Sequence, residues 1–174
     1  PVRILDSRIG VGGYSSPWGQ WDTRTVTVAG VAGIPADAQA VVLNVTVTDT
    51  TSSSYLTAWP AGQPQPTASN LNWPAGDTRP NLVVAKLGAN GAISIFNLLG
   101  STNVIADVEG WFDDGSDPAA DALVAVSPTR VLDSRDGTGG SSTPWASNTQ
   151  RELKLAGVAG VPNDADAVLL NVTV

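Results

Sequence analysis

The chain of 174 residues is 42% hydrophobic and 14% charged, a balance typical of a folded globular chain and not of a disordered one. Sixteen acidic against nine basic residues give a net charge of −7 at pH 7, which disfavours nucleic acid and anionic membrane surfaces as partners. Cys, His and Met are absent, which excludes thiol nucleophiles, disulfides and soft metal ligands. We therefore expect no cofactor, Ca²⁺ being the one common metal that oxygen ligands alone hold.

Apolar and polar residues alternate along most of the chain, which is the pattern of half-buried strands. We expect strands, in chain order, over 2–6, 24–29, 41–47, 54–59, 69–73, 82–87, 92–96 and 103–112. No amphipathic helix of useful length is visible. Two sheets packed face to face bury such strands most economically, so the predicted fold is all-β: a two-sheet β-sandwich or jelly-roll-like repeat of about eight short strands.

Two local patterns refine this expectation. Val41, Leu43, Val45 and Val47 share one face of their strand and should point into the core. Asn90-Gly91 lies between two apolar runs and predicts a tight β-hairpin, because both residues tolerate the positive φ angles that such a turn needs.

The first 47 residues recur near the end of the chain at a constant offset of 127, from Pro1 to Pro128 and from Val47 to Val174. PVRILDSR matches PTRVLDSR, and AGVAGIPADAQAVVLNVTV matches AGVAGVPNDADAVLLNVTV. The repeat predicts a complete unit over 1–112, a linker over 113–127 rich in Asp, Ala and Ser, and a partial second unit over 128–174 with the first three strands only.

Three strands without a partner sheet would leave apolar side chains uncovered, among them Val168, Leu170 and Val172. Their segment, VLLNVTV, carries no charge or Pro that would discourage strand pairing. We expect this edge to be completed by another chain through strand exchange or donation, giving an oligomer or filament. A continuation of the repeat array in the same chain is the alternative.

These motifs resemble a known repeat. P-x-R-[IV]-L-D-S-R, G-V-A-G-[IV]-P-x-D-A-x-A-V-x-L-N-V-T and V-I-A-D-V-E-G-W-F are similar to a tandem β-repeat of secreted and cell-surface proteins of actinobacteria and related bacteria. The resemblance covers both copies. It implies export, a multi-copy architecture and no known catalytic residues. Ser7 stands where the family commonly has Thr, and the hydroxyl is kept.

The R-x-L-D-S-R motif gathers opposite charges in both copies: Arg3, Asp6 and Arg8, and again Arg130, Asp133 and Arg135. A pair of Arg side chains could present a pocket for a sugar or a carboxylate. We favour the other interpretation, in which the Asp is paired inside the protein and ties the first strand to a neighbouring loop.

Asp107 and Glu109 are a close pair of acids on one predicted strand, a separation that a carboxylate-only glycoside hydrolase could use. Any D-x-E on a strand gives this spacing, so we favour structural pairing of these acids with Arg79, Lys86 or a turn amide. We therefore expect the protein not to be an enzyme.

Two acidic segments are candidates for Ca²⁺: Asp113, Asp114 and Asp117 in the linker, and DSRDGTGG at 133–140. The first copy has Ile9 where the second has Asp136, so the second set is not a general property of the repeat. Solvated linker charge is the favoured interpretation.

Six Trp are heavy usage in a chain of this size, and Trp18, Trp21, Trp59 and Trp73 lie beside Pro or Gly or in predicted loops. Such rings could form a platform that stacks on a sugar, with at least two of the four on one exposed surface. Alternatively, they cap the ends of the sandwich. Trp111, on a predicted strand, should be buried.

The sequence therefore predicts an extracellular or cell-surface structural or adhesive module that assembles through strand pairing or tandem repetition. A carbohydrate-binding module that recognises polysaccharide through surface Trp is the alternative, and a hydrolase is the least favoured hypothesis. Membrane insertion is not expected, because no apolar run approaches the roughly 20 residues that span a bilayer.

Overall fold

The computed structural model describes residues 1–113, 129–168, 170 and 172. The chain divides into two compact units, Pro1–Ala120 and Asp121–Val174, and the division falls inside the predicted linker. Residues 114–127 of that linker lie outside the described residues.

Strands in the described part of the chain all belong to the first unit. They are β1 (Val2–Asp6), β2 (Asp22–Thr27), β3 (Ala40–Thr48), β4 (Ser54–Pro60), β5 (Leu71–Trp73), β6 (Arg79–Lys86), β7 (Ala92–Asn97) and β8 (Asn103–Phe112), with one 3-10 turn, η1 (Ala89–Gly91). The bounds of β1 and β8 are those expected from the sequence. The other strands differ from the expected ranges by a few residues at their ends.

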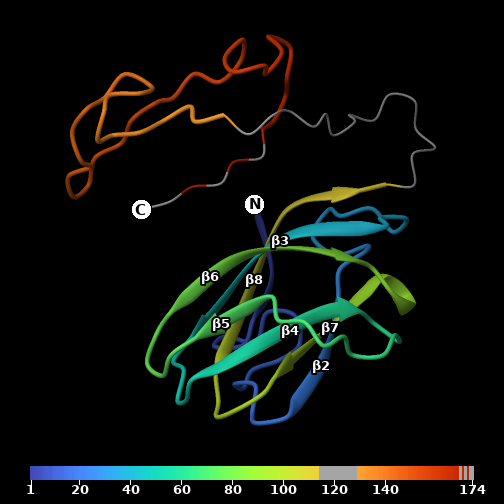
Figure 1. The fold of residues 1–174 in the computed structure, drawn as a ribbon. Coiled ribbons are helices and arrows are strands. Elements are labelled where there is room, and N and C mark those ends of the chain that lie inside the picture. The colour runs from blue at the N-terminus through green and yellow to red at the C-terminus, as the bar shows by residue number, and fades with distance from the viewer. Residues whose placement is uncertain (114–128, 169, 171, 173–174) are drawn as a thin grey trace. The chain divides into compact units, whose positions relative to one another are not determined.

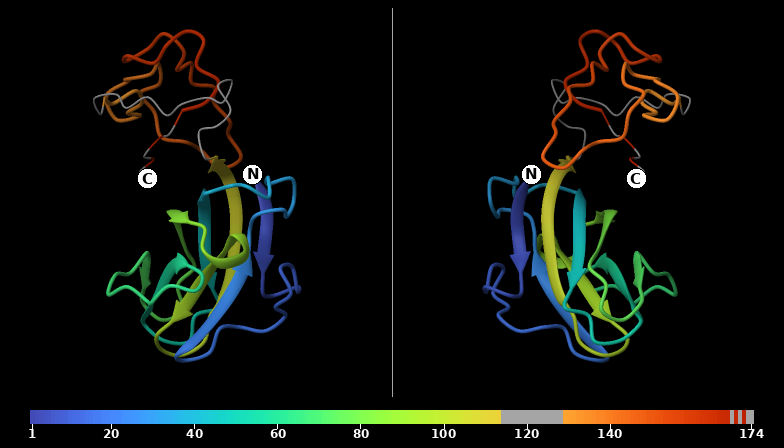
Figure 2. Two further views of the ribbon diagram at one scale, coloured as in Figure 1. Left: turned by 90° about the vertical axis from the view of Figure 1, so that its right-hand side faces the viewer. Right: turned by 90° about the vertical axis from the view of Figure 1, so that its left-hand side faces the viewer.

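The strands form two antiparallel four-stranded sheets, ordered β1-β8-β3-β6 and β2-β7-β4-β5. The labelled strands can be followed in Figure 1, and Figure 2 shows β1 (dark blue) beside the long strand β8 (yellow). The predicted all-β, two-sheet sandwich is confirmed.

The core lies between the facing surfaces of the two sheets. On the central strand β3, buried and half-buried residues alternate without exception, and Val41, Leu43, Val45 and Val47 are fully buried, as predicted. From the other sheet, Leu56 on β4 and Ile93 and Ile95 on β7 belong to the same apolar cluster. Alternation therefore marks the inner face correctly, because one side of each strand must leave water.

The predicted hairpin at Asn90-Gly91 is wrong in its pairing. Both residues do have positive φ, 58° and 63°. However, β6 before the turn pairs with β3, whereas β7 after it pairs with β2 and β4 in the other sheet. The turn conformation is a local property, but the partner of each strand is decided by which apolar faces pack together.

The prediction that Trp111 is buried is also wrong, since the residue is 47% exposed. The pairing of β8 with β3 slips by one residue, so that Gly110 lies opposite Val42 and Val108 opposite Leu43. This β-bulge leaves Glu109 unpaired and puts Trp111 opposite the buried Val41, on the inner face of its sheet. Trp111 is nevertheless exposed, because it is the penultimate residue of β8, where the sheet ends.

The second unit forms no strand in its described residues, although the sequence predicts three. It nevertheless repeats the turns of the first copy. Every residue of 1–47 with positive φ has a counterpart 127 positions later with positive φ, and the pairs are Gly10/Gly137, Gly12/Gly139, Gly13/Gly140, Trp21/Asn148, Gly30/Gly157, Ala32/Ala159 and Gly33/Gly160. Local sequence therefore fixes the turns, whereas the strands require partners that residues 129–172 do not contain.

Two leucines on different sheets give a direct test of where the core lies. Leu56→Ala on β4 removes a fully buried side chain and should lower the free energy of unfolding by about 3 kcal/mol. Leu82→Ala on β6 removes one that is 44% exposed and should cost less than about 1 kcal/mol. Urea denaturation measures both, and equal losses would contradict the assignment of the inner face.

Candidate functional site

Asp6, at the end of β1, is fully buried and accepts four hydrogen bonds. The Arg8 side chain donates from Nε at 2.9 Å and from Nη2 at 2.7 Å, and the Arg8 backbone N–H donates at 3.1 Å. Arg3 Nη1 donates at 3.0 Å. The carboxylate is therefore enclosed by its own turn and is not presented to a ligand, in line with the structural interpretation of the motif.

The same cluster joins β1 to β8. Arg3 donates from Nε and Nη2 to the Asp107 carboxylate, at 2.8 and 3.2 Å, and Ser7 Oγ donates to the Asn103 side chain at 2.8 Å. The partner of Asp107 is thus Arg3 on the neighbouring strand, and the expectation of Arg79 or Lys86 is wrong. Strand order could not be predicted from the sequence, so this contact could not be either.

Hydrogen bonds from the Arg8 side chain lower the pKa of the Asp6 carboxyl to about 2. The Arg8 backbone N–H and the positive charges of Arg8 and Arg3 lower it further, while burial opposes the shift. Asp6 is therefore ionised in the folded protein at neutral pH.

The second copy builds the same cluster without a sheet. Asp133 accepts from Arg135 Nε and Nη2 at 2.9 and 2.7 Å, from the Arg135 backbone at 3.0 Å and from Arg130 Nη1 at 2.6 Å. The Arg135 hydrogen bonds lower the pKa of Asp133 as well. The motif is thus a self-contained turn stabiliser, complete within a few residues of chain.

The two acids considered for hydrolysis are in different environments. Asp107 is half-buried and engaged by Arg3, whereas Glu109 is exposed at the β-bulge of β8. A carboxylate held by both nitrogens of an Arg fork is already satisfied as a structural ion pair. The geometry offers no observation in favour of a paired-carboxylate mechanism.

The candidate Ca²⁺ ligands do not form a metal site in the part of the chain that the structure describes. That part contains no group of three or more acidic side chains able to hold a metal ion. Both Asp133 oxygens are engaged by arginines. Asp136 accepts the Thr138 backbone N–H at 2.9 Å, a hydrogen bond that lowers its pKa. Asp114 and Asp117 lie outside the described residues.

The Trp platform, one of the two possibilities that the sequence left open, is not formed, because three of its four rings are buried in the first unit. Each of them donates its indole N–H to a backbone carbonyl: Trp18 to Ile95 at 3.0 Å, Trp59 to Gln63 at 2.9 Å and Trp73 to Ser52 at 3.1 Å. A buried indole needs such a partner, and a carbonyl of β7 and two loop carbonyls supply it. Burial of these rings agrees with the alternative in which they cap the sandwich, and the condition for a sugar platform, two exposed rings on one surface, is not met.

Trp21 is the exception, 66% exposed and in the left-handed region with φ of 59°. Its ring lies edge to face with Phe96 at 6.2 Å, and Phe96 in turn lies 6.1 Å from Tyr55. The second copy has Asn148 at the position equivalent to Trp21. The exposed ring is therefore specific to the first unit.

A cation–π contact that we did not predict organises both copies. The Arg24 guanidinium lies 4.3 Å from the centre of the Trp18 ring, and the Arg151 guanidinium lies 4.2 Å from that of Trp145. Each Arg also donates to the carbonyl of the Pro before its Trp, at 2.6 Å in the first copy and 3.0 Å in the second. The signal was the spacing P-W-x5-R, which both copies share.

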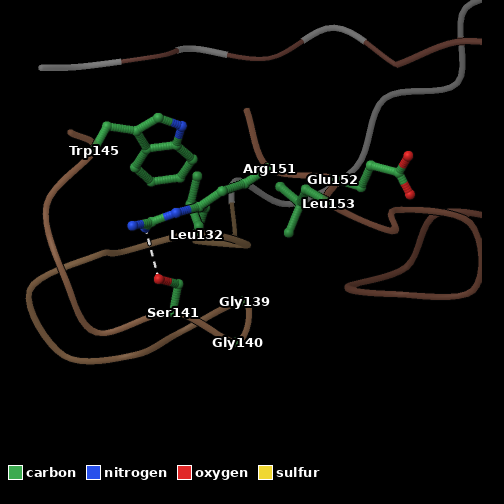
Figure 3. A pocket seen from close by; sticks show the side chains of 8 residues that line it. All are labelled: Leu132, Gly139, Gly140, Ser141, Trp145, Arg151, Glu152 and Leu153. Carbon is green, nitrogen blue, oxygen red and sulfur yellow. Dashed lines mark hydrogen bonds between the residues drawn. The ribbon is translucent and has the colours of Figure 1, made fainter. Parts of the chain in front are cut away.

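A hollow of about 200 Å³ opens in the second unit around Trp145, as Figure 3 shows. It is lined by Leu132, Gly139, Gly140, Ser141, Trp145, Arg151, Glu152 and Leu153. The positions equivalent to Leu132, Trp145 and Leu153 are Leu5, Trp18 and Val26, all of which are buried in the first unit. The hollow therefore exposes apolar side chains whose equivalents are covered in the first unit.

The apolar residues of the second copy remain at the surface in the same way. The exposed fractions, beside those of their first-copy equivalents, are 43% for Trp145 against 0% for Trp18, 41% for Val168 against 0% for Val41, 44% for Leu170 against 0% for Leu43, and 77% for Val172 against 0% for Val45. The predicted assembly edge, Val168, Leu170 and Val172, is thus exposed. These four side chains are of the same types as the core residues of the first unit, but they are exposed to solvent.

The fold and these sites define an antiparallel β-sandwich followed in the chain by a second copy of its N-terminal segment, which forms no strand in its described residues. No family model matches the chain, and no curated protein matches it either. Among solved structures, the Tobacco streak virus coat protein dimer is 12% identical, with a TM-score of 0.33 over 60% of this chain and 87% of that chain. A likeness at this level carries no argument about function. Within the described residues, no helix has the length and apolar character to cross a bilayer.

The Asp6 cluster predicts a pH dependence of stability, measurable in residues 1–115, which contain one copy of the motif. The folded pKa of about 2 lies below the ordinary value of 3.8, so the contribution of Asp6 is present above about pH 4 and is lost as the pH falls towards 2. Asp6→Asn should therefore lower the free energy of unfolding by about 2 kcal/mol at pH 7 and by much less at pH 2. A deficit that does not change with pH would contradict this account.

Replacing Trp18 or Trp21 by Ala should change the free energy of unfolding of residues 1–115 by very different amounts. Trp18→Ala should cost about 4 kcal/mol of unfolding free energy, because it empties a buried site and leaves the Ile95 carbonyl without its donor. Trp21→Ala should cost less than about 1 kcal/mol, since the ring is mostly exposed. Thermal melting of the two variants distinguishes them, and a large loss for Trp21→Ala would show that its ring is covered.

Proposed function

We propose that this chain is an extracellular structural or adhesive repeat module that self-associates through its second copy of the N-terminal segment. The observation that carries the proposal is the set of side chains Trp145, Val168, Leu170 and Val172, which are buried in the first copy and exposed in the second. Burying one Val or Leu side chain contributes about 1.5–3 kcal/mol, so association that covers this set is favourable.

Backbone chemistry supports the same conclusion. The segment around Leu170 has the sequence of the central strand β3, but takes part in no sheet in the residues that the structure describes. It contains no charge and no Pro, the residues with which proteins usually protect exposed strand edges. Strand pairing would satisfy its backbone groups and cover its apolar face together.

The candidate ligand-binding groups of the first unit are used internally, which also supports a structural role. Asp6 is enclosed by its own arginines, and Trp18, Trp59 and Trp73 close the core. An extracellular location is supported by composition, because a chain without Cys and Met offers no sulfur to oxidise. The resemblance of both copies to repeats of secreted and cell-surface proteins supports the same location.

Polysaccharide binding is a second candidate function, for which the observation is the exposed Trp21 ring beside Phe96 and Tyr55. Such a ring can stack on a sugar face. If the first unit binds a polysaccharide, adding that polysaccharide should change the Trp fluorescence of the wild type and not that of Trp21→Ala. Equal responses of the two proteins would exclude Trp21 as the contact.

Two matched variants of the full chain test self-association. Leu170→Asp with Val172→Asp places charges on the assembly edge, and Leu82→Asp with Val84→Asp places the same charges on exposed positions of β6. Light scattering at rising concentration should show masses above 17.8 kDa for the wild type and the β6 variant. The assembly-edge variant should remain monomeric, because unpaired charges cannot enter an apolar interface.

A wild-type chain that stays monomeric at every concentration would contradict the proposal. So would an assembly-edge variant that associates as strongly as the wild type.

A further inference from the structure

The first unit is built from two parts that depend on each other. Every strand of residues 1–48 pairs only with a strand of residues 79–112: β1 with β8, β2 with β7, and β3 with β6 and β8. None of β1, β2 and β3 pairs with another of the three. The N-terminal segment therefore adds its three strands to a part of the sandwich formed by β4 to β8.

We propose that residues 128–174 can take the place of residues 1–47 in this sandwich, so that the β4–β8 part has two alternative N-terminal segments. The site is the one that β1, β2 and β3 fill, and its second occupant is the other copy of the segment, from the same chain or from a second copy of the chain. This goes beyond self-association, because it names the site that the second copy enters.

Sequence identity at the inward-facing positions supports the exchange. Trp18, Val41, Leu43 and Val45 face the core of the first unit, and the second copy has the same residue type at each equivalent position. Four other core positions differ by one methylene group. The second copy has Val in place of Ile4 and Ile34, and Leu in place of Val26 and Val28, so the losses and gains balance. A core tolerates such changes when its total volume is kept.

Contacts across the boundary are preserved as well. Arg3 binds Asp107 and Ser7 binds Asn103 in the first unit, and the second copy supplies Arg130 and Ser134 at these positions. An entering second copy therefore brings the charge that Asp107 needs and the hydroxyl that Asn103 needs. These two side-chain partners of β8 are therefore kept in the exchange.

The second copy is also prepared for entry by its local structure. Its Asp133 cluster and its Trp145–Arg151 contact reproduce the distances of the first copy. Gly139 has the φ of 80° found at Gly12, and at both positions a Cβ atom would lie 2.6 Å from a backbone oxygen. A segment whose turns are already formed loses less conformational entropy when it docks.

The connection allows the exchange to occur within one chain. In the first unit Val2 lies opposite Val108, so β1 begins close to where β8 ends at Phe112. The residues between Phe112 and Pro128 can span about 3.3 Å each, far more than this gap requires. Residues 128–174 could thus follow β8 into the site as a circular permutation of the first unit.

Only one of the two segments, residues 1–47 or residues 128–174, fills the site at a time. The exchange therefore buries the apolar face of one segment and exposes that of the other. Occupancy then follows the difference in fit between the two copies. Tyr14 packs edge to face on Trp18 at 5.4 Å in the first copy, and its equivalent is Ser141. This lost contact favours residues 1–47 as the major occupant and residues 128–174 as the minor one.

Disulfide trapping in the full chain tests the proposal, because the chain contains no Cys of its own. Val45 lies opposite Ala106 on β8, so Ala106→Cys with Val45→Cys should bond and serves as the positive control. Ala106→Cys with Val172→Cys can bond only if residue 172 reaches the position of Val45. Ala106→Cys with Val158→Cys is the negative control, since Val158 is also exposed, at 40%, but its equivalent, Val31, lies outside β3.

Each variant is unfolded in urea, refolded so that both copies compete, and oxidised. We expect the Val172→Cys variant to form the bond in at least about a tenth of the chains, well above the Val158→Cys control. A non-reducing gel shows whether the bond lies within one chain or between two, and either result supports the exchange. Bonding no greater than that of the negative control would overturn it, whatever the light-scattering mass of the wild type.

Rescue of a damaged first copy is an independent readout in the full chain. Leu43→Asp places a charge in the core position of the first copy, and we expect a cooperative melting transition to remain because residues 128–174 replace the damaged segment. Leu43→Asp combined with Leu170→Asp should lose that transition, and Leu170→Asp alone should keep it. Loss of the transition in Leu43→Asp alone would refute the replacement.

Discussion

The strands of residues 1–48 pair only with strands of residues 79–112, far away in the chain, and the rest of the structure depends on that constraint. β1, β2 and β3 find their partners in β6, β7 and β8, and the apolar face of β3 is covered by β4 and β7 of the other sheet. Neither part can bury its apolar face alone. The second copy demonstrates the consequence, since it has the same sequence pattern as β1 to β3 but forms no sheet in its described residues.

Interactions between residues fewer than about ten positions apart form in both copies and do not require the partner sheet. The Asp6 and Asp133 clusters, the two cation–π contacts and the positive-φ turns are alike in both copies, although only one copy belongs to a sandwich. Their energies depend on neighbours in the chain and not on the partner sheet. The N-terminal segment is therefore a chain of preformed turns whose intervening residues become strands only when a partner is present.

The same division explains which chemistry is left for function. The charged and aromatic side chains that suggested a ligand site have partners inside the first unit. Asp6 is bound within its turn, Asp107 is bound across the β1–β8 pair, and three Trp are buried. The described residues of the second copy leave Val168, Leu170 and Val172 exposed, and these are the side chains of the proposed association. Association through these side chains requires no catalytic group, no cofactor and no ligand pocket.

The sequence by itself determined the strands of the first unit, the repeat and the fold class, because alternation and turn residues are local signals: β1 and β8 have the predicted bounds, and β3 buries the predicted face. It also pointed to the pairing of Asp6, whose arginines are two and three residues away. Only the tertiary structure decided that Asn90-Gly91 joins two sheets, that Arg3 binds Asp107, and that Trp18 is buried while Trp21 and Trp111 are exposed. Each of these outcomes depends on strand order, on where a sheet ends or on the facing sheet, and those follow from the packing of segments distant in the chain.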